Sequence, residues 1–284
     1  MRYPAKLLSR KSSGQAVLLV ILGMAVVLTI VLSVVSRSVT DVSVTKVEED
    51  SSKAFSAAEA GIEKLLIGGS SFTESNLGDI GASVSAQALD FGSGTIVDFF
   101  ETYNSGDIAT VWFVSHDDNN IQKLICTTSK PCFNGTSFSV HWNENAAVEV
   151  AVYYGSGAID DPPNFSGVKV KRFAFDPNAT RRNNNKFSAT IASSQQGYSY
   201  STGDIILFGL TRPLFARVKF LYGSVNGFRV TTPTGYPLPS QGRLLVSKGV
   251  ANNAARQIEV RDYYRAPLGI FEAGIFSQGD LTKN

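Results

Sequence analysis

The sequence predicts an α+β fold, in which a long N-terminal helix precedes a mainly antiparallel β head of one or two sandwich-like modules. Three observations lead to this expectation. Residues 15–36 contain no charged side chain, and residues 37–67 keep a helical apolar spacing without proline. From residue 95 onward, β-branched and aromatic runs alternate with turn residues. A chain with 43% apolar and 18% charged residues favours a packed core over disorder.

The N-terminal leader, residues 1–14, is basic. It holds Arg2, Lys6, Arg10 and Lys11 and no acidic residue, whereas the rest of the chain is nearly neutral. A neutral body offers no basic field for nucleic acid, so no nucleic-acid partner is expected. Positive charge before an apolar run keeps the N-terminus in the cytoplasm, so the C-terminal part is expected to be exported.

The uncharged run from Gln15 to Ser36 is expected to span a membrane over about residues 16–36. As a helix it measures ~33 Å, about the thickness of one hydrocarbon core. A buried helix of a soluble protein would normally show a polar face, and this run shows none. The alternative is a cleaved secretory signal ending near Ser36, although the apolar core of such a signal is usually shorter. Inner-membrane lipid is therefore the first expected partner.

Small residues recur along this run. Ala25, Thr29 and Ser33 are spaced by four and would form a stripe on one side of the helix. Such a stripe lets a second membrane helix approach closely. In a run rich in Val and Leu, a chance recurrence fits equally well.

The helix is expected to continue past the membrane to residue 67, which makes it one rod over residues 15–67. Phe55, Ala58 and Ile62, followed by Leu65 or Leu66, form an apolar stripe at helical spacing. Glu49 and Lys53 are placed for a favourable pair between residues four apart. A glycine and serine run at 68–71 ends the pattern. A half-lipid, half-amphipathic helix of this kind must pack against protein over its second half.

These features resemble a type IV pilin precursor. The basic leader, the glycine junction at Gly14 and the segment "AFSAAEAGIEKLL" at 54–66 are together similar to the PilX-type minor pilins and the pseudopilins. The resemblance covers about residues 9–67. It implies cleavage by a prepilin peptidase after Gly14, an N-methylated Gln15, and helix packing with other pilin subunits. The packing residues implied in this way are Leu19, Ala25, Thr29, Ser33, Phe55, Ala58, Glu59 and Ile62.

Two positions depart from the major pilins. Leu19 stands where those proteins carry a glutamate, and Gln15 stands where a phenylalanine is usual. A carboxylate buried in the membrane is costly without a partner, so Leu19 removes both that cost and a docking contact. The resemblance to pseudopilins that cap secretion filaments then implies a place at the tip or in initiation. The alternative is a lineage that lost the glutamate in all its subunits.

The exported part is expected to begin with a linker at 68–94, holding at most one short ordered element. The run "DDPPN" at 160–164 divides the remainder into β modules at 95–159 and 160–284. A single β domain over 95–284 is the alternative. Residues 116–120 predict a hairpin turn, and Asn226-Gly227 predicts another between two strands.

The two cysteines, Cys126 and Cys132, are expected to form a disulfide if the domain is exported. Two reduced thiols in one loop are the alternative. A zinc site would need more ligands than this stretch supplies. His116 precedes two aspartates, but their spacing fits a surface turn better than a metal loop. His141 alternates within a strand and is expected to be an ordinary strand residue.

No phosphate loop, nucleophile elbow or other catalytic motif is found in the sequence, so we expect no enzyme, cofactor or metal site. The expected function is that of a minor pilin or pseudopilin-like subunit, anchored in the membrane before assembly and displayed on the pilus afterwards. The first alternative is an anchored adhesin that does not polymerise. The second is an anchored enzyme, which a paired carboxylate cleft would favour.

Overall fold

The computed structural model describes residues 13–68, 70–75, 77, 81–118, 120, 123–159 and 166–266. Contacts divide the chain into two units. We call residues 1–61, 73–85 and 248–257 the helix unit, and residues 62–72, 86–247 and 258–284 the head unit. The predicted α+β class is confirmed, because one long helix precedes a mostly antiparallel set of sheets. Residues 1–12 of the leader lie outside the described residues.

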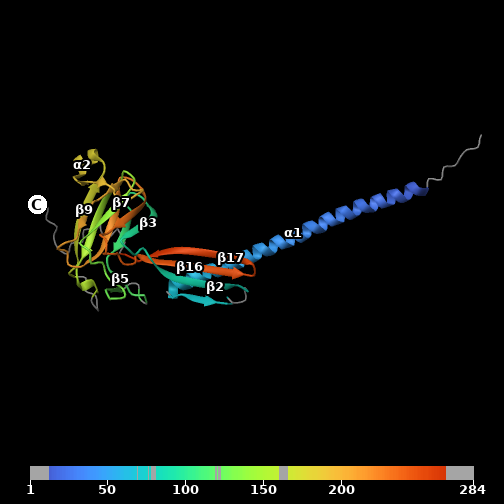
Figure 1. Ribbon diagram of the computed structural model, residues 1–284, viewed down its shortest axis with the longest axis horizontal. Coiled ribbons are helices and arrows are strands. Elements are labelled where there is room, and N and C mark those ends of the chain that lie inside the picture. The colour runs from blue at the N-terminus through green and yellow to red at the C-terminus, as the bar shows by residue number, and fades with distance from the viewer. Residues whose placement is uncertain are drawn as a thin grey trace, which may run out of the picture. The chain divides into compact units, whose positions relative to one another are not determined.

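The long helix is a single element. Helix α1 runs from Ser13 to Gly68 without interruption, and Figure 1 draws it as one unbroken coil. No proline occurs along it, and threonine hydroxyls bond back to its own carbonyls. The predicted pair between Glu49 and Lys53 is present at 2.6 Å.

Four strands form the sheet order β1-β2-β16-β17. Their bounds are Phe72–Glu74 for β1, Ser83–Phe91 for β2, Gly242–Ala251 for β16 and Ala254–Tyr263 for β17. The linker expected at 68–94 is therefore wrong over most of its described length. Alternation in β2 buries Val84 and Ala86, which a linker would leave exposed. The division between the two units passes through β2, β16 and β17.

Two larger sheets make up the head unit, where Figure 1 labels β3, β7 and β9. The first has the order β10-β9-β8-β14-β4 and the second β11-β12-β7-β15-β3, with β13 also paired to β7. Bounds in the first sheet are Ser188–Ala189, Lys169–Asp176, Ala147–Tyr154, Pro213–Leu221 and Ile108–Trp112. In the second they are Ile191–Ala192, Tyr200–Ser201, Ser137–Trp142, Val225–Thr231 and Ile96–Tyr103, with β13 at Ile205–Ile206.

Four short elements complete the described part of the head. Strands β5 (Ser115–His116) and β6 (Leu124–Ile125) pair in the hairpin expected around residues 116–120. A 3-10 turn occupies Gly157–Ile159. Helix α2 spans Ala179–Asn185, where Asn178 caps the first turn by accepting a hydrogen bond from the Arg181 backbone N–H.

A division of the head at residue 160 is not what the chain forms. Strand β8 lies before that position, and it pairs with β9 and β14, which lie after it. In the second sheet, β15 pairs with both β3 and β7 from the earlier part of the chain. One hydrophobic cluster draws buried side chains from both sheets, so these two sheets share a core. The alternative of a single β domain over 95–284 would also include residues 248–257, which belong to the helix unit.

The predicted hairpin turn at Asn226-Gly227 is also wrong. Both residues lie inside β15, where the pairing with β3 shifts register between Asn226 and Phe228. Gly227 has φ +80°, and a Cβ there would meet the Phe99 carbonyl oxygen at 2.8 Å. The Asn-Gly pair therefore forms a β-bulge rather than a chain reversal.

A buried glutamine completes the end of strand β4. The Gln241 side chain is 1% exposed; its Oε1 accepts the Trp112 N–H at 2.6 Å, and its Nε2 donates to the Trp112 carbonyl at 3.0 Å. The same Nε2 donates to the Pro239 carbonyl at 2.7 Å. One side chain thus performs the hydrogen bonding that a neighbouring strand would otherwise supply.

We predict that Gln241→Met lowers the free energy of unfolding by about 3 kcal/mol, because it leaves the buried Trp112 N–H and C=O groups without partners. Tryptophan fluorescence during denaturation of the full chain in detergent measures this. Gln196→Met is the matched control, since Gln196 is exposed and should tolerate the change. Equal stability of the two variants would contradict the role given to Gln241.

Candidate assembly surface on the N-terminal helix

The first half of α1 presents apolar side chains to its surroundings. Residues 15–49 are all exposed within this chain, and the segment is long and apolar enough to cross a membrane. Val20, Met24 and Leu28, for example, are each about three-fifths exposed or more. Such a surface is stable only in lipid or against other apolar helices.

Hydroxyl groups in and beyond this segment are satisfied locally. Thr29 Oγ1 donates to the Val26 carbonyl at 2.7 Å, and Thr40 Oγ1 donates to the Ser36 carbonyl at 2.9 Å. Thr45 repeats the contact on Asp41 at 2.9 Å. A threonine bonded to its own helix can enter an apolar environment without a free donor.

The membrane-side residues expected to pack with other subunits are all available. Gly14 lies in the first turn of α1 and Gln15 directly follows it. Leu19 is 66% exposed, and Ala25, Thr29 and Ser33 are also exposed. Gln15 is exposed as well, so from Gln15 to Ser33 none of these residues is buried by the described chain.

The second half of α1 has a buried face that differs in part from the predicted stripe. Ala58, Ile62 and Leu65 are buried as expected, whereas Phe55 is 46% exposed and Leu66 is 50% exposed. Successive helix residues are ~100° apart, so a face centred near Ala54 leaves Phe55 at its edge. Glu59 is likewise exposed. The buried face is made mostly of small residues: Ala54, Ala57, Ala58 and Gly61, with Asp50 at one end.

Close backbone approach explains the small residues. In the helix unit, the turn region of β16 and β17 lies on α1 at Gly249. A Cβ on Gly249 would overlap the carbonyl oxygen of Ala54 and lie 2.7 Å from the Ala58 nitrogen. Only glycine fits this position, because any side chain would force the strand away from the helix.

Polar contacts fix the same hairpin along the helix. Asn252 Nδ2 donates to Asp50 Oδ1 at 2.8 Å, which accounts for a buried carboxylate on the helix. Arg256 donates to Ser51 Oγ from Nε at 2.9 Å and from Nη2 at 2.7 Å. The sequence gives no local signal for these partners, since about 200 residues separate them along the chain.

A groove runs beside this contact. Its volume is ≈450 Å³, and its lining residues are Val47, Glu48, Ser51, Ser52, Phe55 and Arg256. Val47 and Phe55 give it an apolar floor next to the exposed part of α1. The groove therefore continues the apolar surface of the helix beyond the expected membrane span.

The Glu49–Lys53 pair lies on the exposed side of the helix. The hydrogen bond and charge of Glu49 raise the pKa of Lys53 above its usual value. Both side chains are solvent-accessible, so the pair adds little to stability and serves mainly to keep this side polar.

Outside the helix, Cys126 and Cys132 are joined by a disulfide, with their Cα atoms 5.2 Å apart. No group of three potential metal ligands among His, Cys, Asp and Glu occurs in the described part of the chain. Asp160 and Asp161 lie outside it. The surface turn expected at His116 is wrong for the histidine itself, which lies in β5 and is 4% exposed. The aspartates that follow it lie beyond the strand, where the Asn120 N–H donates to Asp117 Oδ1 at 3.2 Å.

His141 makes the arrangement closest to a catalytic pair. It lies in β7, 3% exposed, with Nδ1 2.9 Å from Ser193 Oγ and Nε2 2.9 Å from Thr231 Oγ1. Burial, with a smaller effect of Arg229, lowers the pKa of His141 to about 4. The Ser193 hydroxyl already accepts the Gln195 N–H at 3.0 Å, and a hydroxyl rather than a carboxylate faces Nε2. These contacts tie the segment after β11 to the sheet.

His116 is enclosed by aromatic rings. Its ring stacks on Tyr264 at 3.9 Å and meets Trp112 edge-on at 4.5 Å between centroids. Its Nδ1 is buried and has no hydrogen-bond partner among the residues the structure describes. Burial, reinforced by the positive charge of Lys130, lowers the pKa of His116 to about 4.

Comparison of the chain with protein-family models, with curated proteins and with solved structures gives no match. The geometry of α1 and of the head is therefore the basis of the functional argument.

We predict that Gly249→Ala loosens the hairpin at 248–257 from α1, because the added methyl group overlaps helix backbone. An overpacking cost of ~1–3 kcal/mol raises the equilibrium constant for local opening of the hairpin by roughly tenfold or more. The measurement is the rate of tryptic cleavage after Arg256 in the full chain. Gly167→Ala is the matched control, since a Cβ there meets nothing within 4 Å. Unchanged cleavage in both variants would be incompatible with the close approach.

We predict that His116→Phe reduces the loss of stability in weak acid. The wild-type histidine has a lowered folded pKa, so its contribution is complete above pH 6.5 and is lost as the pH falls towards about 4. Between pH 7 and pH 5 this amounts to about 2 kcal/mol. Denaturation at pH 7 and at pH 5 measures the free energy of unfolding at each pH. Its decrease between the two should be smaller in the variant than in the wild type by about that amount. An identical drop in wild type and variant would refute the assignment.

Proposed function

We propose that this chain is a minor pilin or pseudopilin-like subunit of a type IV pilus or related filament. The single observation that carries the proposal is α1: one uninterrupted helix whose first half exposes apolar residues and whose second half is covered on only one face. The head contributes a sandwich-like pair of sheets around one core and no catalytic role.

Before assembly, α1 would hold the subunit in the membrane with its N-terminus in the cytoplasm and its head exported. Prepilin peptidase would cut after Gly14, which exposes Gln15 for methylation. The helix would then leave lipid for a bundle of other pilin helices. This exchange replaces lipid contacts by helix contacts of similar polarity, so its free-energy cost is small.

Two surfaces of α1 support a role in such a bundle. The stripe of Ala25, Thr29 and Ser33 permits close approach in the apolar half. Beyond it, Phe55 lies partly exposed beside a groove, while the adjacent small-residue face is already occupied by the chain's own hairpin. Neighbouring helices would therefore contact the Phe55 side.

Leu19 supports a place at the tip or in initiation. A subunit without a carboxylate at this position cannot form a charge pair with the terminal amine of a neighbour. It would therefore join the filament through apolar contacts alone, which suits a position with fewer neighbours. After assembly, the exposed surface of the subunit would form part of the pilus surface.

The second candidate function is a single-pass adhesin that never polymerises. A cleft in the head unit, beside the disulfide, favours this candidate, because an adhesin must bind a ligand through its head. The two functions differ in what they require of Phe55.

We predict that Phe55→Asp abolishes filament incorporation, because it places a carboxylate at an apolar helix contact where burial costs several kcal/mol. The measurement is the fraction of the subunit recovered in sheared filaments, with an expected loss of at least about tenfold. Phe100→Asp is the matched control, since Phe100 is 60% exposed on the head unit.

The mass of the N-terminus in the same samples identifies the processing. Methylated Gln15 agrees with a filament subunit, an N-terminus at Arg37 indicates a secreted protein, and an intact Met1 indicates the non-polymerising adhesin. Wild-type protein absent from filaments, or equal incorporation of Phe55→Asp and wild type, would overturn the proposal.

A further inference from the structure

A second surface, independent of the helix, lies on the head unit. A cleft of ≈900 Å³ opens between the disulfide loop at 126–136 and the segment at 207–213. Its two sides come from parts of the chain about 80 residues apart, and backbone hydrogen bonding joins them, since the Leu207 N–H donates to the Thr136 carbonyl at 2.8 Å. The cleft is therefore a built feature of the head fold.

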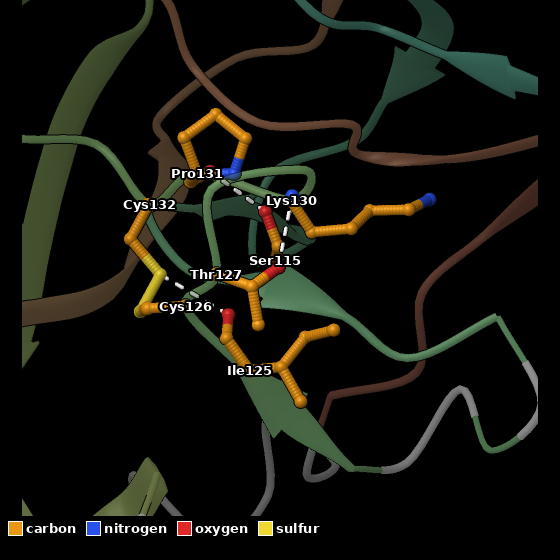
Figure 2. Close-up of a disulfide and its surroundings, with 7 residues drawn as sticks. All are labelled: Ser115, Ile125, Cys126, Thr127, Lys130, Pro131 and Cys132. Atoms are coloured by element: carbon orange, nitrogen blue, oxygen red, sulfur yellow. Dashed lines mark hydrogen bonds between the residues drawn. A yellow bond between two sulfur atoms is a disulfide. The ribbon is translucent and has the colours of Figure 1, made fainter.

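The disulfide loop lines one side of this cleft. Figure 2 shows the disulfide and the hydrogen bonds that brace this loop. The Thr127 N–H donates to the Lys130 carbonyl at 3.0 Å, and the Lys130 N–H donates to Thr127 Oγ1 at 3.0 Å. Ser115 Oγ donates to the Pro131 carbonyl at 2.7 Å, which fastens the loop to strand β5. Cross-linked and hydrogen-bonded at both ends, this side is held in place before any ligand arrives.

The opposite side displays an uncovered aromatic ring. The segment from Leu207 to Leu210 is a tight turn, closed by a hydrogen bond from the Leu210 N–H to the Leu207 carbonyl at 2.9 Å. Gly209 takes φ +83° in this turn, and Leu207 is buried in the core at 3% exposure. Phe208, between them, is 82% exposed. The turn therefore presents the Phe208 ring, an apolar face of fixed geometry, to a ligand in the cleft.

Arg212, at the same side, supplies an unmatched positive charge. It has φ +49°, a left-handed conformation that a side-chain-bearing residue rarely adopts, and its carbonyl accepts the Gly155 N–H at 3.1 Å. Within the described part of the chain its guanidinium makes no ion pair or hydrogen bond, and no carboxylate lines the cleft. Residues held in this backbone region cluster at functional sites, and the unpaired guanidinium leaves Arg212 free to bind an anionic group.

The rest of the lining is rich in small polar groups. Asn134, Thr136 and Ser156 face the cleft, and their side chains form no hydrogen bond within the described residues. Amide and hydroxyl groups of this kind fix the orientation of a ligand that carries several hydroxyls.

We propose that this cleft binds a carbohydrate that carries a carboxylate, such as a uronic or sialic acid. The C–H face of a pyranose ring would cover Phe208, the Arg212 guanidinium would pair with the carboxylate in a two-bond fork, and Asn134 with the hydroxyl side chains would bind the sugar hydroxyls. A peptide is the less fitting ligand, because Leu207 is buried in the core and Leu210 packs partly buried against it, so neither offers an apolar pocket for peptide side chains. The site goes beyond the filament role and does not require assembly.

The test uses the full chain in detergent and a panel of oligosaccharides containing uronic or sialic acid, each with its carboxyl-reduced neutral counterpart. Calorimetric titration should detect an acidic member of the panel and show at least about tenfold weaker binding of its neutral form. Phe208→Ala and Arg212→Gln should each weaken binding about tenfold or more. Phe100→Ala and Lys169→Gln, at exposed positions outside the cleft, are the matched controls and should bind as the wild type does.

A near-ultraviolet spectrum and melting temperature equal to wild type establish that each variant is folded; an unfolded variant is replaced by Phe208→Leu or Arg212→Lys. Binding of no panel member, equal binding of acidic and neutral forms, or equal binding by the two cleft variants would overturn the proposal. Binding of acidic peptides in place of sugars, lost in the same variants, would overturn the ligand class. These results are independent of whether Phe55→Asp enters filaments.

Discussion

The contact of Gly249 with the backbone of α1 is the constraint on which the organisation of the helix depends. Because a strand lies against the helix at Ala54 and Ala58, this face must be made of small residues. Asp50 and Ser51 then become the polar partners of Asn252 and Arg256. One face of the second half is closed by the chain itself, and the Phe55 face is left open.

This division separates intramolecular from intermolecular roles along one element. Ile62 and Leu65 are buried in the protein's own fold, so substitutions there would test folding rather than assembly. Phe55, Leu19 and the stripe from Ala25 to Ser33 are not buried by the described chain. A substitution at Phe55 therefore tests assembly, whereas a substitution at Ile62 does not.

The sequence predicts the parts of this structure that local periodicity determines. The helix at 15–67 is close to the observed Ser13–Gly68, because an uncharged run and a proline-free periodic segment leave few alternatives. Strand β2 was not recognised within its Gly- and Ser-rich surroundings, since its pairing with β16 brings together residues more than 150 positions apart. Asn226-Gly227 forms a bulge because a close approach to Phe99, rather than a turn, requires glycine at 227.

The site residues that the sequence missed share the same cause. Nothing near Gly249, Gln241 or Phe208 in the chain signals a partner, because each acts on a distant segment or on open space. A turn of the form Leu-Phe-Gly-Leu with a glycine at its third position is the one local signal that could have drawn attention to Phe208.

The position of Gln241 has a consequence for self-association. Strand β4 is an edge strand of its sheet. The unpaired backbone groups of an edge strand can pair with a β-strand of another molecule. Gln241 occupies the Trp112 amide and carbonyl, and the next carbonyl, that of Phe113, accepts the Phe133 N–H at 2.8 Å. The backbone groups at this end of β4 are thus occupied by the protein's own groups, which disfavours aggregation through this edge.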